Sequence, residues 1–158
     1  KQSWWRMGVL LASFPIYIMG RFFGFRSHLC GKLTGIMKKI LLVEDEPALQ
    51  ESFKTAFVGK GYELTQAMDG EEGLAVMRAQ KPDVVLLDLV LPKKHGFEVL
   101  KEMKSDANLK DLPVIVLTNL ENSEDVEKAL ELGATTYLVK ANYSLEEVVQ
   151  KVEETLRN

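Results

Sequence analysis

Cysteines, zinc-ligand clusters and long apolar runs are scarce in this sequence, and each scarcity excludes a class of protein. Cys30 is the single cysteine among 158 residues, so a framework of internal disulfides is excluded and nothing indicates an oxidising compartment. No cysteines and histidines are spaced as in a zinc site. With 46% hydrophobic and 27% charged residues, the composition is that of a globular protein large enough to bury a core. We therefore expect a cytoplasmic protein.

Acidic residues are absent from the first 36 positions, which hold five basic residues and carry a formal charge of +5. Residues 37–158 hold fifteen basic and all 23 acidic residues, and their formal charge is −8. So sharp a difference predicts two segments with separate roles, 1–36 and 37–158. Direct binding of nucleic acid relies on cationic surface, so we do not expect it of the second segment.

An apolar run without charged residues extends over 14 positions, from Met7 to Gly20. As a helix it would span about 21 Å, short of the ~30 Å hydrocarbon core of a bilayer, and Pro15 weakens that helix. Three interpretations remain: a membrane or interfacial anchor, a cleaved secretory signal, or an upstream extension outside the working protein. We expect the last, because Met37 directly precedes the first predicted strand. Residues 37–158 are not expected to bind a membrane.

Residues 37–158 alternate between short apolar runs and amphipathic stretches of helical period. The apolar runs predict five strands, over 39–43, 62–67, 83–87, 114–117 and 135–139. Asp69 with Glu72, and Ser144 with Glu147, predict capping boxes at two of five helices, and Ser123 predicts the cap of a third. Strands and helices in alternation form βαβ units. The fold class is therefore α/β, a doubly wound five-stranded parallel sheet with five helices.

Polar side chains follow four of the five predicted strands. Glu44 and Asp45 follow the first strand, Asp88 the third, Thr118 the fourth and Lys140 the fifth. In a doubly wound sheet the ligand site lies at the carboxyl ends of the strands, so we expect these side chains at one edge. Three carboxylates that lie together repel one another, and Mg²⁺, which prefers carboxylate oxygens, relieves that repulsion.

Metal-assisted phosphoryl transfer is the chemistry that these groups fit. The ionised carboxylate of Asp88 can attack phosphorus and form an acyl phosphate. The backbone carbonyl of Val90 can give the metal a further oxygen ligand. Lys140 and Thr118 can then bind the remaining phosphoryl oxygens.

Four stretches of the sequence resemble a known family: ILLVEDEP over 40–47, VVLLDLVLPKKHGFEVL over 84–100, PVIVLTN over 113–119 and GATTYLVK over 133–140. In this order and spacing, residues 37–158 resemble the receiver domain of two-component response regulators, and in particular the single-domain, CheY-like type. The resemblance implies the strand order 2-1-3-4-5. It also implies that Glu44 and Asp45 bind Mg²⁺ and that Asp88 accepts the phosphoryl group.

The resemblance implies a signalling mechanism as well. Thr118 would be the switch hydroxyl, Lys140 the partner of the phosphoryl group and Tyr137 the switch aromatic ring. A histidine kinase or phosphotransfer protein would be the donor, and a protein target would bind to the face formed by helix four, strand five and helix five. We expect a stand-alone response regulator. A phosphorylation-independent interaction module on the same fold is the alternative.

We expect no enzyme activity beyond the chain's own phosphorylation and slow dephosphorylation. Haloacid dehalogenase-like phosphatases need an acid/base aspartate two residues after the nucleophile, where this chain has Val90. A flavoprotein would need a glycine-rich phosphate loop after the first strand, where Glu44, Asp45 and Glu46 would repel a cofactor phosphate.

Two positions depart from the family pattern beside the expected site. Ala141 replaces the usual proline after Lys140, and a cis bond before alanine costs about 2.5–4 kcal/mol, so this bond is either trans or strained. Asn119 follows Thr118, where the family commonly has a small residue, usually alanine. We expect the Asn119 side chain to alter the lifetime of the acyl phosphate.

Overall fold

The computed structural model describes residues 37–157, and they form a parallel sheet between two layers of helices. The interpretations of 1–36 fall outside the described residues. The strands are β1 (Lys38–Val43), β2 (Tyr62–Ala67), β3 (Val84–Leu87), β4 (Val114–Thr118) and β5 (Thr136–Val139). They lie in the order β2-β1-β3-β4-β5, and all four neighbouring pairs are parallel. The predicted fold class and strand order are confirmed.

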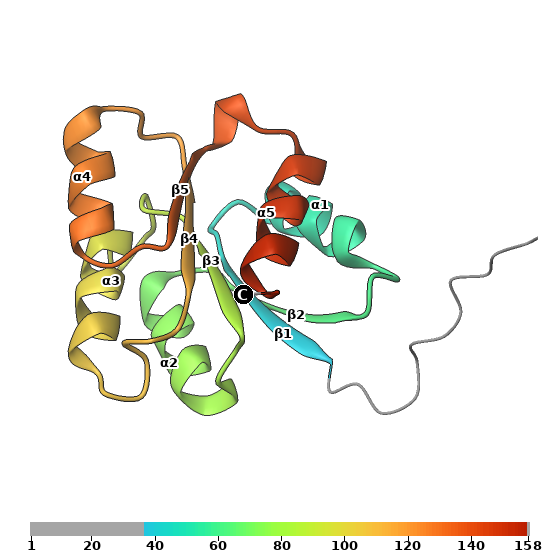
Figure 1. Cartoon of the computed structure of the whole chain (residues 1–158), viewed down its shortest axis with the longest axis horizontal. Coiled ribbons are helices and arrows are strands. Elements are labelled where there is room, and N and C mark those ends of the chain that lie inside the picture. The colour runs from blue at the N-terminus through green and yellow to red at the C-terminus, as the bar shows by residue number, and fades with distance from the viewer. Residues whose placement is uncertain (1–36, 158) are drawn as a thin grey trace, which may run out of the picture. The chain divides into compact units, whose positions relative to one another are not determined.

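Helices cover both faces of the sheet, as Figure 1 shows. They are α1 (Pro47–Phe57), α2 (Gly70–Gln80), α3 (Gly96–Ser105), α4 (Ser123–Glu131) and α5 (Leu145–Thr155), with a short 3₁₀ helix over Lys140–Asn142. α2, α3 and α4 lie on one face, and α1 and α5 lie on the other (Figure 1). No helix within residues 37–157 is both long enough and apolar enough to cross a bilayer.

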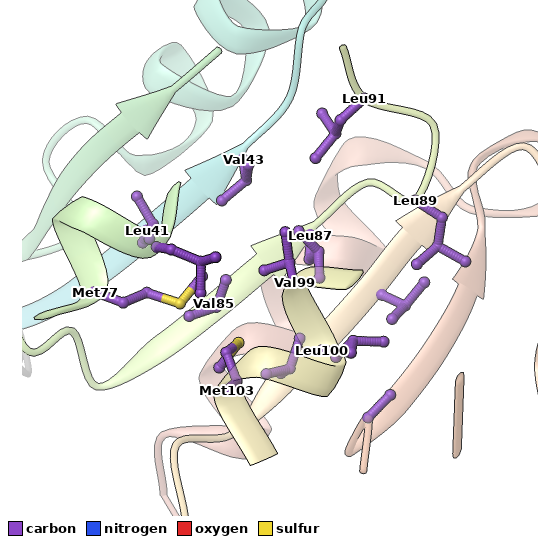
Figure 2. Packing of buried hydrophobic residues seen from close by; sticks show 14 of the residues in the cluster. Leu41, Val43, Met77, Val85, Leu87, Leu89, Leu91, Val99, Leu100 and Met103 are labelled. Atoms are coloured by element: carbon purple, nitrogen blue, oxygen red, sulfur yellow. The ribbon is translucent and has the colours of Figure 1, made fainter. Parts of the chain in front are cut away.

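Alternate residues of the central strands enter two separate hydrophobic cores, because successive side chains of a strand point to opposite faces. Leu41, Val85 and Val116 belong to the core beneath α2, α3 and α4. Figure 2 shows part of this core, with Met77, Val99, Leu100 and Met103 of the helices against the strand residues. Ile40, Leu86 and Ile115 belong to the core beneath α1 and α5. Burial on both faces explains why these strands are continuously apolar in sequence.

Four strand ends differ from the prediction by one residue: β1 begins at Lys38, β3 at Val84 and β5 at Thr136, and β4 ends at Thr118. Asp83 precedes β3 instead of opening it, because its carboxylate accepts hydrogen bonds from Lys39 N at 2.8 Å and from Lys38 Nζ at 2.8 Å. Thr118 is the last residue of β4, where the apolar run alone predicted an end at Leu117. The pattern of apolar residues in the sequence cannot reveal that the Asp83 carboxylate binds the start of β1.

The helix caps were predicted with partial success. The box of Ser144 and Glu147 at α5 is confirmed. At α2, Asp69 accepts from Glu72 N at 2.9 Å, but the Glu72 carboxylate bonds to Met68 N at 2.7 Å, so the predicted reciprocal box is wrong. At α4 the cap is Asn122, whose Oδ1 accepts from Asp125 N at 2.8 Å, and Ser123 is the first helical residue.

Candidate functional site

The polar residues that follow the strands meet at one edge of the sheet because the backbone ladder continues past the strand ends. Glu44 N donates to Ala67 O at 3.0 Å, which extends the pairing of β1 with β2. Asp88 N donates to Val43 O at 3.0 Å, which extends the pairing of β3 with β1. Both acidic residues therefore lie at the same height as the last residues of their neighbouring strands.

Lys140 connects the two buried carboxylates of this edge. Its Nζ lies 2.7 Å from Glu44 Oε2 and 2.7 Å from Asp88 Oδ2. Glu44 is 1% exposed and Asp88 is 6% exposed. Burial raises the pKa of the Glu44 carboxyl above its usual range, although Lys140 opposes this rise. Burial also lowers the pKa of Lys140, but its bonds to Asp88 and Glu44 outweigh burial and raise it.

Three carboxylates form a set of oxygens that fits a divalent cation. One oxygen each from Glu44, Asp45 and Asp88 lies within 4.8 Å of the others, and Asp45 is exposed to solvent. Hard carboxylate oxygens with an open side are what Mg²⁺ accepts, since it retains waters and takes phosphate oxygens as further ligands. Val90 N donates to Asp88 Oδ1 at 3.1 Å, so the loop that carries the Val90 carbonyl begins against the same carboxylate.

Thr118 and Tyr137 lie on the neighbouring strands β4 and β5. Thr118 is fully buried, and its Oγ1 accepts a long, 3.5 Å hydrogen bond from Leu120 N. Tyr137 is half-buried, and its hydroxyl donates to Leu120 O at 2.9 Å. Burial raises the pKa of the Tyr137 hydroxyl, and the negative charges of Asp125 and Asp88 add to this rise. Both side chains therefore bond to the same residue of the loop after β4.

The loop from β3 to α3 packs against the start of α2. Lys93, at φ 60°, donates from Nζ to Asp69 Oδ2 at 2.5 Å. At Gly96 a Cβ atom would clash with Asp88 O and with Leu89 Cα, so only glycine fits there. Sequence reasoning missed the ion pair between Asp69 and Lys93, because no single sequence motif contains both residues.

Gln50 is a further residue whose role at this edge sequence reasoning missed. Gln50 is the fourth residue of α1, and its side-chain amide donates a hydrogen bond to the backbone carbonyl of Glu44. It stands on the same helical stripe as Phe53 and Phe57, three and seven positions later. A polar residue on that apolar stripe was the available signal.

The two departures from the family pattern have a plain structural outcome. Residues 37–157 contain no cis peptide bond, so the bond between Lys140 and Ala141 is trans, and these residues form the start of the 3₁₀ helix. Asn119 is exposed at the end of β4, beside the buried Thr118.

Comparison with known proteins adds a family to this geometry. The model of the response regulator receiver domain matches residues 40–153. The chain belongs to the receiver domain family. This receiver domain contains every residue of the edge described above, from Glu44 to Lys140.

Solved receiver structures have the same fold. The receiver domain of the Francisella response regulator 1452 superposes with a TM-score of 0.70 at 29% identity, over 76% of this chain and 97% of that one. The Mn²⁺-bound form of response regulator Rcp1 superposes with a TM-score of 0.67 at 38% identity, over 73% of this chain and 91% of that one. The Rcp1 structure is thus that of a response regulator with a bound metal ion, Mn²⁺.

Curated relatives of this receiver domain are longer proteins. The DNA-binding dual master transcriptional regulator RpaA of Synechocystis is 36% identical over 121 residues, which cover 77% of this chain and 50% of that protein. The probable transcriptional regulatory protein TcrX of Mycobacterium tuberculosis is 39% identical over 118 residues, which cover 75% of this chain and 49% of that protein. The chain thus spans about half the length of the curated relatives that it matches.

Proposed function

We propose that residues 37–158 form a stand-alone response regulator of the cytoplasm, which accepts a phosphoryl group on Asp88 and signals by altered protein binding. The observation that carries the proposal is the double contact of Lys140, at 2.7 Å from both Glu44 and Asp88. This contact brings the Lys140 ammonium together with the Asp88 and Glu44 carboxylates within one small volume, which supports Asp88 as the proposed nucleophile. Such a set can stabilise the charge that moves during phosphoryl transfer.

The transfer step uses Asp88 in its ionised form. One of its oxygens attacks the phosphorus of a phosphohistidine on a histidine kinase or phosphotransfer protein. The new P–O bond forms as the P–N bond breaks, and the electron pair of that bond returns to the imidazole nitrogen. Glu44, Asp45, Asp88 and the Val90 carbonyl would hold Mg²⁺, which would supply neutralisation of the charge on the phosphoryl oxygens.

Lys140 and Thr118 act on the phosphoryl group after transfer. The group adds negative charge and strong acceptors beside Asp88. Lys140, which already bonds to Asp88, holds one phosphoryl oxygen, and the Thr118 hydroxyl turns to donate to another. Because Thr118 and Tyr137 both bond to Leu120, movement of Thr118 shifts the loop before α4 and the tyrosine with it. The face of α4, β5 and α5 changes in consequence, and the protein target reads this change.

Incubation with acetyl phosphate and Mg²⁺, followed by intact mass measurement, tests this function. The wild-type chain should gain the mass of one phosphoryl group, and Asp88→Asn should gain none, because an amide cannot attack phosphorus as a carboxylate does. Asp111→Asn is the matched control, since it makes the same change at an exposed position before β4. An equal gain by Asp88→Asn would assign the phosphoryl group to another residue. A wild-type chain that gains nothing would favour the phosphorylation-independent interaction module.

The lengths of the relatives favour a second candidate, in which this receiver controls a DNA-binding regulator of the kind that RpaA is named to be. In that case the output would be DNA binding by a further part of the protein. The intact mass of the native protein distinguishes the two candidates, and it also tests whether residues 1–36 accompany the receiver as a separate segment.

A further inference from the structure

Gln50 is a polar side chain in an apolar position. It lies in α1 on the face that also buries Phe53 and Phe57, and it is 8% exposed. Burial of an amide costs free energy unless its hydrogen bonds are made inside the protein. The partners of the Gln50 amide therefore indicate what this residue does.

The amide of Gln50 joins the carboxyl ends of β1 and β2. Its Nε2 donates to Glu44 O at 2.6 Å and to Ala67 O at 3.1 Å, and it lies 3.0 Å from Met68 Sδ. Glu44 N also donates to Ala67 O, at 3.0 Å. Two groups thus fix the backbone at Glu44 to the end of β2: the amide of Glu44 itself and the side chain of Gln50.

The bond to Glu44 O acts on more than that carbonyl. The carbonyl of Glu44 and the amide nitrogen of Asp45 belong to one planar peptide unit, so fixing the oxygen fixes the plane. The plane sets the direction in which the chain leaves β1. It therefore also sets the position of the Asp45 backbone, from which the Asp45 carboxylate extends. Asp45 is exposed, so the packing of a core does not restrain it.

We propose that Gln50 is a positioning residue for the metal ligands Glu44 and Asp45, an inference that rests on the proposed function. It acts through the backbone, and its hydrogen bonds within the described residues go to the ends of β1 and β2 and not to Asp88, Thr118 or Lys140. Gln50 therefore supports metal affinity and leaves the nucleophile and the phosphoryl-binding side chains in place.

Gln50→Met tests the proposal, because methionine keeps the length of the side chain and removes its donor. Direct binding of Mn²⁺, measured by the loss of the free-ion EPR signal, should weaken about tenfold, as expected for loss of a group that orients a ligand. The Mg²⁺ concentration for half-maximal phosphorylation by acetyl phosphate should rise by a similar factor. The rate at saturating Mg²⁺ should stay within about twofold of wild type.

Gln66→Met is the matched control. The Gln66 amide donates to the backbone carbonyl of Gln50 at 2.8 Å, so this variant also loses an amide between β2 and α1. It leaves the bonds to Glu44 O and Ala67 O intact, and its Mn²⁺ affinity should equal that of wild type. If Gln66→Met weakens Mn²⁺ binding as much as Gln50→Met, the amide of Gln50 only ties α1 to the sheet and the proposal is overturned.

A second variant covers the case in which Gln50→Met does not fold. Gln50→Asn keeps the amide but withdraws it by one methylene, so it cannot reach both carbonyls, and its Mn²⁺ affinity should also fall. Wild-type affinity in a folded variant of either kind would overturn the positioning role. A wild-type chain that binds neither Mn²⁺ nor beryllium fluoride would instead refute the proposed function, so the two failures are distinguishable.

Discussion

Lys140 shares its charge between two carboxylates, and this sharing decides how each side chain of the site behaves. Burial raises the pKa of the Glu44 carboxyl, and the Lys140 ammonium, 2.7 Å away, opposes this rise because it stabilises the ionised form. Asp88 receives the same ammonium group on one oxygen and the Val90 amide on the other. These two contacts hold the Asp88 carboxylate in one orientation, which under the proposed function would lower the entropic cost of the transfer.

Asn119 is the residue from which we predict a change in phosphate lifetime. It is exposed and directly follows the buried Thr118, and we expect its side chain to narrow the entrance by which water would reach an acyl phosphate on Asp88. Asn119→Ala should widen this entrance and speed dephosphorylation by a few-fold, measured as the decay of the phosphorylated mass after acetyl phosphate is removed. Asn108→Ala makes the same change in the loop before β4, at the opposite end of the sheet, and should leave the decay unchanged. Equal decay of wild type and Asn119→Ala would refute the idea.

Single residues differ in how far the sequence reveals them. Glu44, Asp88 and Lys140 each follow an apolar run directly, so their place at the strand ends was predictable, and the structure brings them together. Gln50 was not predicted, because its partners are backbone carbonyls, which no side-chain motif records. Residues that act through the backbone of other residues are the part of a site that a single sequence conceals.

At the scale of elements, the start of α2 is tied to the loop that follows Asp88. Asp69 caps the helix through Glu72 N, and its second oxygen accepts from Lys93. Gly70 leaves no room for a Cβ atom against the Lys94 carbonyl and Val99. The loop is therefore clamped between α2 and its own helix α3, which restrains the segment that carries Val90.

This clamp predicts a dependence of stability on pH. The backbone amide of Glu72, and then Lys93, hold the pKa of the Asp69 carboxyl below its usual 3.8. A lowered folded-state pKa gives stability that is present above the unfolded value and is lost as the pH falls through the folded value. Asp69→Asn should therefore lower the Tm at neutral pH, and its deficit should shrink as the pH falls below the usual carboxyl pKa of 3.8 toward the lowered folded-state value. A deficit that is constant with pH would show that the charge of Asp69 contributes nothing.

The boundaries of helices and strands were predictable to about one residue where an apolar pattern ends at a turn. They were less predictable where a hydrogen bond from a side chain sets the boundary. β2 begins and ends where its pattern predicts. Asp83 was misplaced because its carboxylate caps β1 from outside the strand. The cap of α4 was misassigned because Asn122 and Ser123 are both good capping residues, and only the bond from Asp125 N distinguishes them.

At the scale of the whole molecule, the acidic edge predicts that stability depends on divalent cations. Three carboxylates lie within 4.8 Å of one another, and one lysine offsets only part of their charge. Adding Mg²⁺ at ten times its dissociation constant should stabilise the folded chain by about 1.4 kcal/mol, and a chelator should reverse this. Asp45→Asn should lose most of this response in thermal unfolding, whereas Glu46→Gln, at the neighbouring exposed position, should retain it. An unchanged response in Asp45→Asn would remove Asp45 from the metal site.

The bond between Lys140 and Glu44 joins residues that are 96 positions apart in the chain. During synthesis at about 5–20 residues per second, Glu44 leaves the ribosome roughly 5–20 seconds before Lys140 does, and Asp88, 52 positions before Lys140, leaves it roughly 3–10 seconds before Lys140 does. Throughout that interval the nascent chain carries Asp88 without the cation that orients it. Under the proposed function, competence to accept the phosphoryl group therefore arises only when β5 docks on the sheet, and we expect a chain that terminates before β5 to stay unphosphorylated even if its first four strands fold.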